Sequence, residues 1–380
     1  MATFVGIGCM SGSSLDGLDI CCVEFTGDVC SDLWGYRILT AETVPYATEW
    51  TDRLRDAAKL SGADLIKLHV DYGQFVGRTV SEFIEKNKLA NVQFVSSHGH
   101  SVFHQPTDGF TFQLGDGQTT STHLTIPYVC DFRTKDVCLG GQGAPLVPCG
   151  ERFLFTNNEM CVNLGGIANI GIKGHSGYDV STCNIVLNRL ASQINGKFLF
   201  DKDGQLARSG KIVSEVLEKL NDLSYFRQPP PKSLWRDYIE KEVYPLLNRE
   251  QYKVEDLLRT CTEHVALKVA EACIDAKELM PNNVSVPSVL FTGGGALNKF
   301  LIELINEKLE GKGFKVEKAD EDTINFKEAL IFAFLGLRCL LGEENVFREI
   351  TGSSSDTISG SIHRPLPTRT AKPISLLNAR

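Results

Sequence analysis

Hydroxyl and carboxylate side chains gather in a glycine-rich segment near the start of the chain. An apolar run ends in Gly-Cys-Met-Ser-Gly-Ser-Ser, and a second apolar run follows Leu-Asp-Gly, a pattern that predicts a β-hairpin. Ser11, Ser13 and Ser14 supply hydroxyl donors, and successive backbone N–H groups can bind an anion such as phosphate. Asp16 and Asp19 carry oxygen ligands of the kind that hold Mg²⁺ directly or through water. An ordinary hairpin rich in glycine and serine is the alternative.

Two more glycine-rich turns follow later in the sequence. Residues 160–172 repeat the order apolar run, Gly-Gly, apolar run, and Val289 begins a strand-like run that meets three glycines and then an amphipathic helical pattern. Backbone N–H groups and the helix dipole at such a strand–helix junction favour phosphate or the polar edge of a nucleotide. Neither a P-loop sequence nor a GxGxxG after the first strand is present, so a dinucleotide-binding fold is disfavoured. The residues expected to contact a nucleotide are Gly12, Ser13, Ser14, Leu15, Asp16, Gly17, Leu18, Asp19, Gly165, Gly166, Gly293, Gly294 and Gly295.

The order of these three segments resembles the actin/hexokinase/Hsp70 class of ATP-binding proteins. In that class two related domains each present a hairpin to the phosphates, and a later glycine-rich turn meets the adenosine. The resemblance implies an α/β, RNase H-like fold with two domains and an inter-domain cleft. We expect residues 1–130 and 345–380 to form the first domain and residues 131–344 the second. The candidate hinges are the glycine-rich crossing at 135–148 and a return crossing near 343–353.

Composition limits the classes of protein to consider. A chain of 380 residues can form two sizeable cores, and its net charge of −8 opposes nonspecific binding to nucleic acid or to anionic membranes. Its twelve cysteines form no CxxC, so buried thiols in a reducing cytoplasm are expected rather than a zinc site. The start of the chain does not resemble a signal peptide, and the longest apolar stretch, 329–341, is too short to span a bilayer.

Two polar clusters follow strand-like apolar runs. His98 and His100 could form hydrogen bonds or transfer protons, but they alternate faces in an extended strand, which argues against joint metal binding. Histidines satisfied within a loop are the alternative. Arg133 can clamp a carboxylate or phosphate through two hydrogen bonds, and an ion pair with Asp131 or Asp136 is the alternative.

Two carboxylates stand near expected helix starts. Asp179 precedes a helical pattern and is accompanied by Ser, Thr and Asn. N-capping of the helix by one of these residues is the alternative, and because capping needs only one of them, the aspartate is available as a general base. Glu328 opens the apolar helix expected at 327–341, where a carboxylate is favourable to the helix dipole in any case. Further helices are expected at about 52–88 and 254–278.

Ten segments together resemble anhydro-N-acetylmuramic acid kinase, a bacterial cell-wall-recycling family of the actin/hexokinase/Hsp70 class. They read GCMSGSSLDGLDI, SSHGHSVFHQP, LGDGQ, DFRTKDVCLGGQGAPLVP, VNLGGIANI, FDKDGQLARSGKI, SYFRQPPPKS, FTGGGALN, EALIFAFLGLR and ITGSSS. In this family, water opens the 1,6-anhydro bond of the sugar while O6 takes the γ-phosphoryl group of ATP. The resemblance implies that Asp179 is catalytic, that Glu328 assists it, that His98 and Arg133 line the sugar site, and that residues 12–19 hold the ATP phosphates.

The chain departs from the family pattern next to both carboxylates. Where the family reads Asp-Thr-Gly-Pro-Gly-Asn, residues 179–184 read Asp-Val-Ser-Thr-Cys-Asn, which predicts a turn of different shape. The acidic pair before the assisting glutamate is replaced by Phe326 and Lys327. A catalytically silent nucleotide- or muropeptide-binding protein and a kinase for another sugar are therefore the alternatives. We expect ATP, Mg²⁺ and a small sugar as ligands, no nucleic-acid or membrane partner, a homodimer, and a cytoplasmic location.

Overall fold

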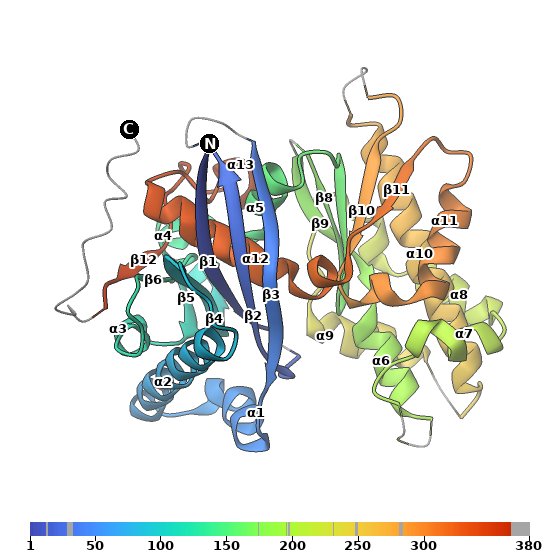
Figure 1. Cartoon of the computed structure of the whole chain (residues 1–380). Helices are drawn as coiled ribbons and strands as arrows, with labels where there is room; N and C mark the ends of the chain where they lie inside the picture. The colour runs from blue at the N-terminus through green and yellow to red at the C-terminus, as the bar shows by residue number, and fades with distance from the viewer. Residues whose placement is uncertain are drawn as a thin grey trace. The chain divides into compact units, whose positions relative to one another are not determined.

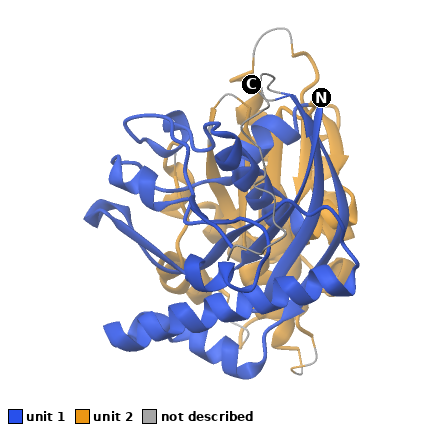
Figure 2. Cartoon of the chain, turned by 60° about the vertical axis from the view of Figure 1, so that its left-hand side comes forward, with its two compact units in different colours: residues 1–156, 326–380 blue, residues 157–325 orange. Residues whose placement is uncertain are grey.

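The computed structural model describes residues 1–12, 14–28, 33–173, 175–194, 196, 198–230, 232–247, 250–280 and 284–365. Ser13, one of the expected phosphate-binding residues, lies outside them, as does the segment after residue 365. The chain divides into two compact units, the first formed by residues 1–156 and 326–380 and the second by residues 157–325 (Figure 2). Each unit is built on one β-sheet with helices around it.

The first unit contains a seven-stranded sheet in the order β12-β6-β4-β1-β2-β3, with β5 paired to β4 (Figure 1). Its strands are β1 (Ala2–Ser11), β2 (Gly17–Gly27), β3 (Trp34–Pro45), β4 (Phe94–Gln105), β5 (Phe110–Leu114), β6 (Tyr128–Cys130) and β12 (Ser361–His363). The pairs β1–β2 and β2–β3 are antiparallel, whereas β1–β4 and β4–β6 are parallel. The hairpin predicted between the first two apolar runs is confirmed.

The second unit repeats the same topology in a five-stranded sheet, with the order β11-β10-β7-β8-β9. Its strands are β7 (Met160–Leu164), β8 (Ile167–Ile172), β9 (His175–Thr182), β10 (Ser288–Thr292) and β11 (Lys315–Lys318). The pairs β7–β8 and β8–β9 are antiparallel, and β7–β10 and β10–β11 are parallel. Three antiparallel strands followed by two parallel strands in both units is the RNase H-like arrangement, so the predicted pair of related α/β domains is confirmed.

Thirteen α-helices are found among the described residues. They are α1 (Thr48–Arg55), α2 (Gly62–Lys86), α3 (Gly117–Ser121), α4 (Thr134–Cys138), α5 (Val147–Leu154), α6 (Asn184–Ser192), α7 (Gln205–Ser209), α8 (Ser214–Asn221), α9 (Arg236–Tyr238), α10 (Val254–Lys277), α11 (Lys299–Leu309), α12 (Glu321–Leu341) and α13 (Arg348–Thr351). The helix predicted over 52–88 is wrong in one respect, because residues 56–61 separate α1 from α2. None of the described helices has the length and apolar character needed to cross a membrane.

Alternation along β1 explains how helices cover both faces of the first sheet. Ile7 and Cys9 are fully buried in a core shared with Val76 and Val80 of α2. Gly8 points to the other face, where an added Cβ would lie 1.8 Å from the carbonyl oxygen of Ala329 in α12. The glycine therefore permits the backbone of α12 to lie directly against β1, close to Glu328.

The boundaries between the units differ from those expected at 130/131 and 344/345. Residues 131–156 belong to the first unit because their side chains pack there: Asp136 is fully buried and accepts a 2.7 Å hydrogen bond from Thr351 Oγ1, and Phe153 contacts Phe334. Both candidate hinge segments therefore lie inside the first unit. The chain passes between the units at residues 156–157 and again at 325–326.

Candidate active site

The turn between β1 and β2 is shaped by local polar contacts. Leu15 has a positive φ of 59°, and its N–H donates to the carbonyl of Gly12 at 3.4 Å. Ser14 Oγ donates to Asp16 Oδ1 at 2.7 Å, and both of these side chains are exposed. The prediction for Ser11 is wrong, because its side chain is buried beneath the turn and hydrogen-bonded to other side chains. Ser14 thus remains a described hydroxyl at the surface of this turn.

Asp19 lies on β2 among groups of the same charge. Its Oδ1 accepts a 2.5 Å hydrogen bond from Thr43 on the neighbouring strand β3. Burial raises the pKa of this carboxyl to about 6, the Thr43 hydrogen bond opposes the rise, and the charges of Asp16 and Glu328 add to it. Like charges held near one another in this way favour the binding of a cation.

Glu328 follows a break in α12. Phe326 has non-helical angles (φ −118°, ψ 15°), so Glu328 opens the apolar segment of the helix, as expected. Much of its side chain is accessible to solvent, yet the protein around it still desolvates the carboxyl and raises its pKa, against the charges of Lys327 and Arg133. Lys327 itself is buried and forms a 3.1 Å ion pair with Glu151 of α5.

His98 and Arg133 form a pair within the first unit. Arg133 Nε and Nη2 lie 3.0 and 2.8 Å from His98 Nε2, which accepts, and Nη1 donates to the Gly143 carbonyl at 2.6 Å. The other ring nitrogen of His98 donates to the carbonyl of Gly99 at 3.0 Å. Burial, with the Arg133 charge, holds the pKa of His98 well below its ordinary value, so the neutral ring fixes the guanidinium rather than transferring protons.

The alternatives for the two histidines and for Arg133, loop histidines and an ion pair, can also be compared with the structure. Both histidines lie on β4 rather than in a loop. His100 is hydrogen-bonded to Ser11, whereas His98 is hydrogen-bonded to Arg133 and Gly99. Among the described residues Arg133 has no ion pair with either nearby aspartate: Asp131 accepts from Thr134, and Asp136 from the Gly143 N–H and Thr351. Burial lowers the pKa of Arg133 to about 10, and Glu328 is the charge that opposes this effect.

The second unit brings two of the predicted glycine turns together. Added Cβ atoms on Gly293 and Gly295 would lie 2.9 and 2.7 Å from atoms of Leu164, at the end of β7. Next to that strand, the carbonyls of Gly165 and Gly166 accept hydrogen bonds from the N–H groups at the start of α6. The glycines are thus needed for close contact between the β7–β8 tip and the turn after β10.

Asp179 is positioned by a proline-rich segment that lies far away in the sequence. Its N–H donates to the Lys232 carbonyl at 3.0 Å, its Oδ2 accepts from the Leu234 N–H at 2.8 Å, and its carbonyl accepts from Tyr225 Oη at 2.5 Å. Burial raises the pKa of the carboxyl, and the Leu234 hydrogen bond opposes this. With Oδ2 held in place, Oδ1 is the oxygen that can accept a proton.

The sequence change after Asp179 has a structural consequence. Asp179 is part of β9, which continues to Thr182, and β-branched Val180 and Thr182 favour this extended backbone where the family pattern has glycines and proline. Helix α6 then begins at Asn184, and its N-cap residue Cys183 makes no side-chain cap, so the capping alternative is wrong. The roles of Tyr225 and Leu234 were not predicted, although they lie within or beside the motif SYFRQPPPKS.

The sequence model of the family described as "Anhydro-N-acetylmuramic acid kinase" matches residues 4–365. The chain belongs to this family. Relatives named anhydro-N-acetylmuramic acid kinase include one from Francisella tularensis subsp. novicida, 30% identical over 94% of this chain and 98% of the relative, and one from Paramagnetospirillum magneticum, 32% identical over 95% and 100%. Among solved structures, the chain is similar to the activator of 2-hydroxyisocaproyl-CoA dehydratase from Clostridium difficile with bound ADPNP, with a TM-score of 0.41, 12% identity, and coverage of 87% and 93%.

Proposed function

We propose that the protein is an ATP-dependent anhydro-N-acetylmuramic acid kinase that hydrolyses the 1,6-anhydro bond of its sugar and phosphorylates O6. The observation that carries this proposal is the family match over residues 4–365, nearly the full length of the chain. In the proposed reaction the oxygen of water bonds to C1 and the C1–O6 bond breaks. O6 then bonds to the γ-phosphorus as the bond to ADP breaks, which gives N-acetylmuramic acid 6-phosphate and ADP.

The described contacts support a division of roles between the two carboxylates. We assign the proton of the attacking water to Asp179 Oδ1, because Oδ2 is already held by the Leu234 N–H. Burial raises the pKa of Asp179, which makes its carboxylate a better base than that of a fully hydrated aspartate. We assign to Glu328 the support of the reacting sugar, and to the Arg133 guanidinium, oriented by His98, the binding of an anionic or carbonyl group of the sugar.

The turn between β1 and β2 fits a Mg²⁺ ion together with ATP phosphates. Asp16 is exposed, and the second carboxylate oxygen of Asp19 is not engaged by Thr43, so both present hard oxygen ligands. The described residues contain no cluster of three or more metal-ligating side chains. In this proposal the remaining ligands of the ion would be phosphate and water. Such an ion would neutralise charge on the transferring phosphoryl group. The nucleotide contacts would come from residues 12–19, from Gly165 and Gly166, and from the glycines at 293–295.

We further infer a homodimer that acts in the cytoplasm, where ATP is available. Light scattering at several protein concentrations tests the assembly. A mass of one chain at every concentration would contradict the dimer without affecting the proposed reaction.

Incubation with ATP, Mg²⁺ and 1,6-anhydro-N-acetylmuramic acid, followed by mass spectrometry, tests the activity. A product heavier than the sugar by one water and one phosphoryl group is expected. The altered strand after Asp179 is the observation that favours the alternatives. Phosphorylation without added water would indicate a kinase for a different sugar, and ATP binding without turnover of any sugar would indicate a silent nucleotide- or muropeptide-binding protein.

A further inference from the structure

Tyr46 contacts both ends of the turn between β1 and β2. It follows directly after β3, and its backbone N–H donates to the carbonyl of Asp16 at 3.3 Å, immediately before β2 begins. Its hydroxyl donates to Ser11 Oγ at 2.7 Å, at the last residue of β1. One residue therefore connects the two positions between which the turn is formed.

The hydroxyl of Tyr46 belongs to a chain of buried polar groups. Tyr46 Oη lies 2.6 Å from Tyr72 Oη, and Ser11 Oγ lies 3.0 Å from His100 Nδ1. Because Tyr46 donates its one proton to Ser11, Tyr72 donates to Tyr46. Ser11 Oγ is buried between Tyr46 and His100, so these two side chains, and not a phosphate, are its hydrogen-bond partners.

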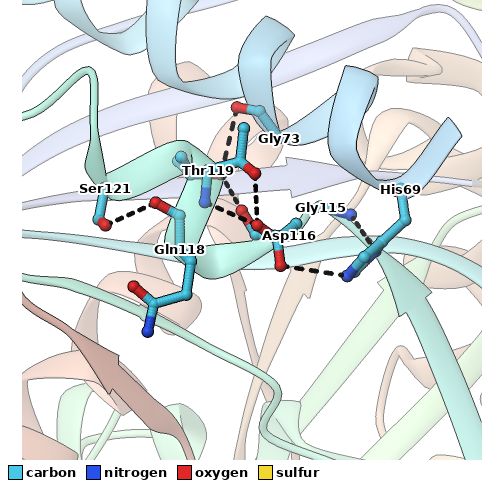
Figure 3. A network of polar contacts seen from close by, with 8 residues as sticks. His69, Gly73, Gly115, Asp116, Gln118, Thr119 and Ser121 are labelled. Carbon is cyan, nitrogen blue, oxygen red and sulfur yellow. Dashed lines mark hydrogen bonds and ion pairs between the residues drawn. The ribbon is translucent and has the colours of Figure 1, made fainter. Parts of the chain in front are cut away.

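Helix α2, which carries Tyr72, is hydrogen-bonded to a second segment of the first unit. Tyr72 lies on α2, and Figure 3 shows the neighbouring part of that helix bonded to the LGDGQ segment. His69 Nδ1 accepts from the Gly115 N–H at 3.1 Å, its carbonyl accepts from the Asp116 N–H at 3.1 Å, and Thr120 donates to the Gly73 carbonyl at 3.2 Å. An added Cβ on Gly73 would lie 2.7 Å from the Asp116 carbonyl oxygen, so α2 and this segment are in close backbone contact.

Packing fixes the Tyr46 ring independently of its hydroxyl. The ring centroid lies 6.4 Å from that of Tyr72 and 5.7 Å from that of Phe75, both on α2. A Tyr46→Phe substitution therefore keeps the ring in place and removes only the hydrogen bonds to Ser11 and Tyr72. The hydroxyl can therefore be removed without changing the fold.

We propose that Tyr46, acting through Ser11 and backed by Tyr72 and His100, is a positioning residue that holds the β1–β2 turn in the shape that binds the phosphates of ATP. This rests on the proposed function, since it assigns the turn to the nucleotide phosphates. Tyr46 does not touch the nucleotide in this account. It fixes the direction of the backbone N–H groups of the turn. These groups are therefore already oriented for hydrogen bonds to a phosphate before ATP binds.

The Tyr46→Phe substitution is expected to weaken ATP binding about tenfold, as for the loss of one or two buried hydrogen bonds. Affinity for adenosine is expected to stay unchanged, because the glycine turn after β10, and not the β1–β2 turn, is assigned to the adenosine. The KM for ATP should rise by the same factor while the KM for the sugar stays within about twofold. Tyr72→Phe, which leaves the Tyr46–Ser11 hydrogen bond intact, should have a smaller effect.

Calorimetric titration of the full-length protein with ATP and with adenosine is the test, with Tyr252→Phe as the matched control. Tyr252 also donates from a phenol, to Glu215 in the second unit, and its loss should change neither affinity. If Tyr46 acts through Ser11, the Tyr46→Phe/Ser11→Ala double variant should bind ATP no more weakly than the weaker single variant. Ser11→Ala alone supplies the result if Tyr46→Phe does not fold.

Unchanged ATP affinity in Tyr46→Phe, or equal loss of ATP and adenosine affinity, would overturn the proposal. ATP affinity does not depend on the sugar reaction, so a wild-type protein that binds ATP without turning over the sugar would contradict the proposed function and still decide the role of Tyr46. A wild-type protein that does not bind ATP would contradict both.

Discussion

Replacing Asp19 by Asn is expected to stabilise the folded protein at pH 8 in the absence of metal. Asp19 has a pKa raised from 3.8 to about 6, chiefly by burial, with the charges of Asp16 and Glu328 contributing. A carboxyl group whose pKa is higher in the folded than in the unfolded state does not lower the free energy of unfolding at a pH below its unfolded pKa. The loss of stability grows between pH 3.8 and about 6 and is complete above that range.

The shift sets the size of the effect. At about 1.36 kcal/mol per pKa unit, it corresponds to at most about 3 kcal/mol at pH 8, and partial exposure of the side chain reduces this to about 1–2 kcal/mol. At pH 4.5 only about a third of the cost has built up. Asn cannot ionise, yet its side-chain oxygen still accepts from Thr43. The substitution should therefore remove the charge penalty and keep the hydrogen bond.

Urea denaturation of the wild type and the Asp19→Asn variant, with EDTA at pH 4.5 and pH 8, measures this difference. Asp108→Asn is the control, because it makes the same chemical change at an exposed aspartate of the same unit and should not reproduce the gain in stability at pH 8. With Mg²⁺ and ATP present, the wild type should bind both, and this binding should remove the difference in the free energy of unfolding between it and the variant. A variant that is no more stable than the wild type at pH 8, or that gains equally at both pH values, would refute the reasoning.

Three further outcomes are expected. Asp179→Asn should lower kcat by roughly 10²–10⁴ in a steady-state assay with ATP affinity unchanged, and a near-native kcat would refute its role as the base. Lys327→Met should destabilise the protein by about 3 kcal/mol in urea denaturation by leaving the partly buried Glu151 without its partner, and adding Glu151→Leu should recover most of the loss; additive losses would contradict the ion-pair account. Small-angle scattering should give a smaller radius of gyration with an ATP analogue and sugar than without ligands, the chain bending where it passes between the units, and identical radii would count against such closure.

Local patterns were sufficient to predict the glycine turns. Each turn is a short glycine-rich run that follows an apolar run, and both hairpins and the strand–turn–helix junction at 293–295 were found where they were expected. The repeated order of these elements also predicted two related α/β units. The signal was strong because it depends on residues that are adjacent in the sequence.

The contacts that orient the site could not be predicted from neighbouring residues. Ser11 looks like a phosphate ligand until Tyr46 and His100, which lie 35 and 89 positions away, are seen to use its hydroxyl. Likewise the Leu234 N–H reaches Asp179 across 55 positions. The predicted boundaries of the units were wrong for the same reason, because residues 131–156 pack against partners much later in the chain.

Nuclear magnetic resonance of the purified reaction product tests the central claim most directly. If O6 leaves C1 and accepts the phosphoryl group, the phosphorus must couple to the two protons on C6, and C1 must be a free reducing end that shows both anomers. A phosphorus coupled to a ring proton, or a C1 still bonded to O6, would contradict the account.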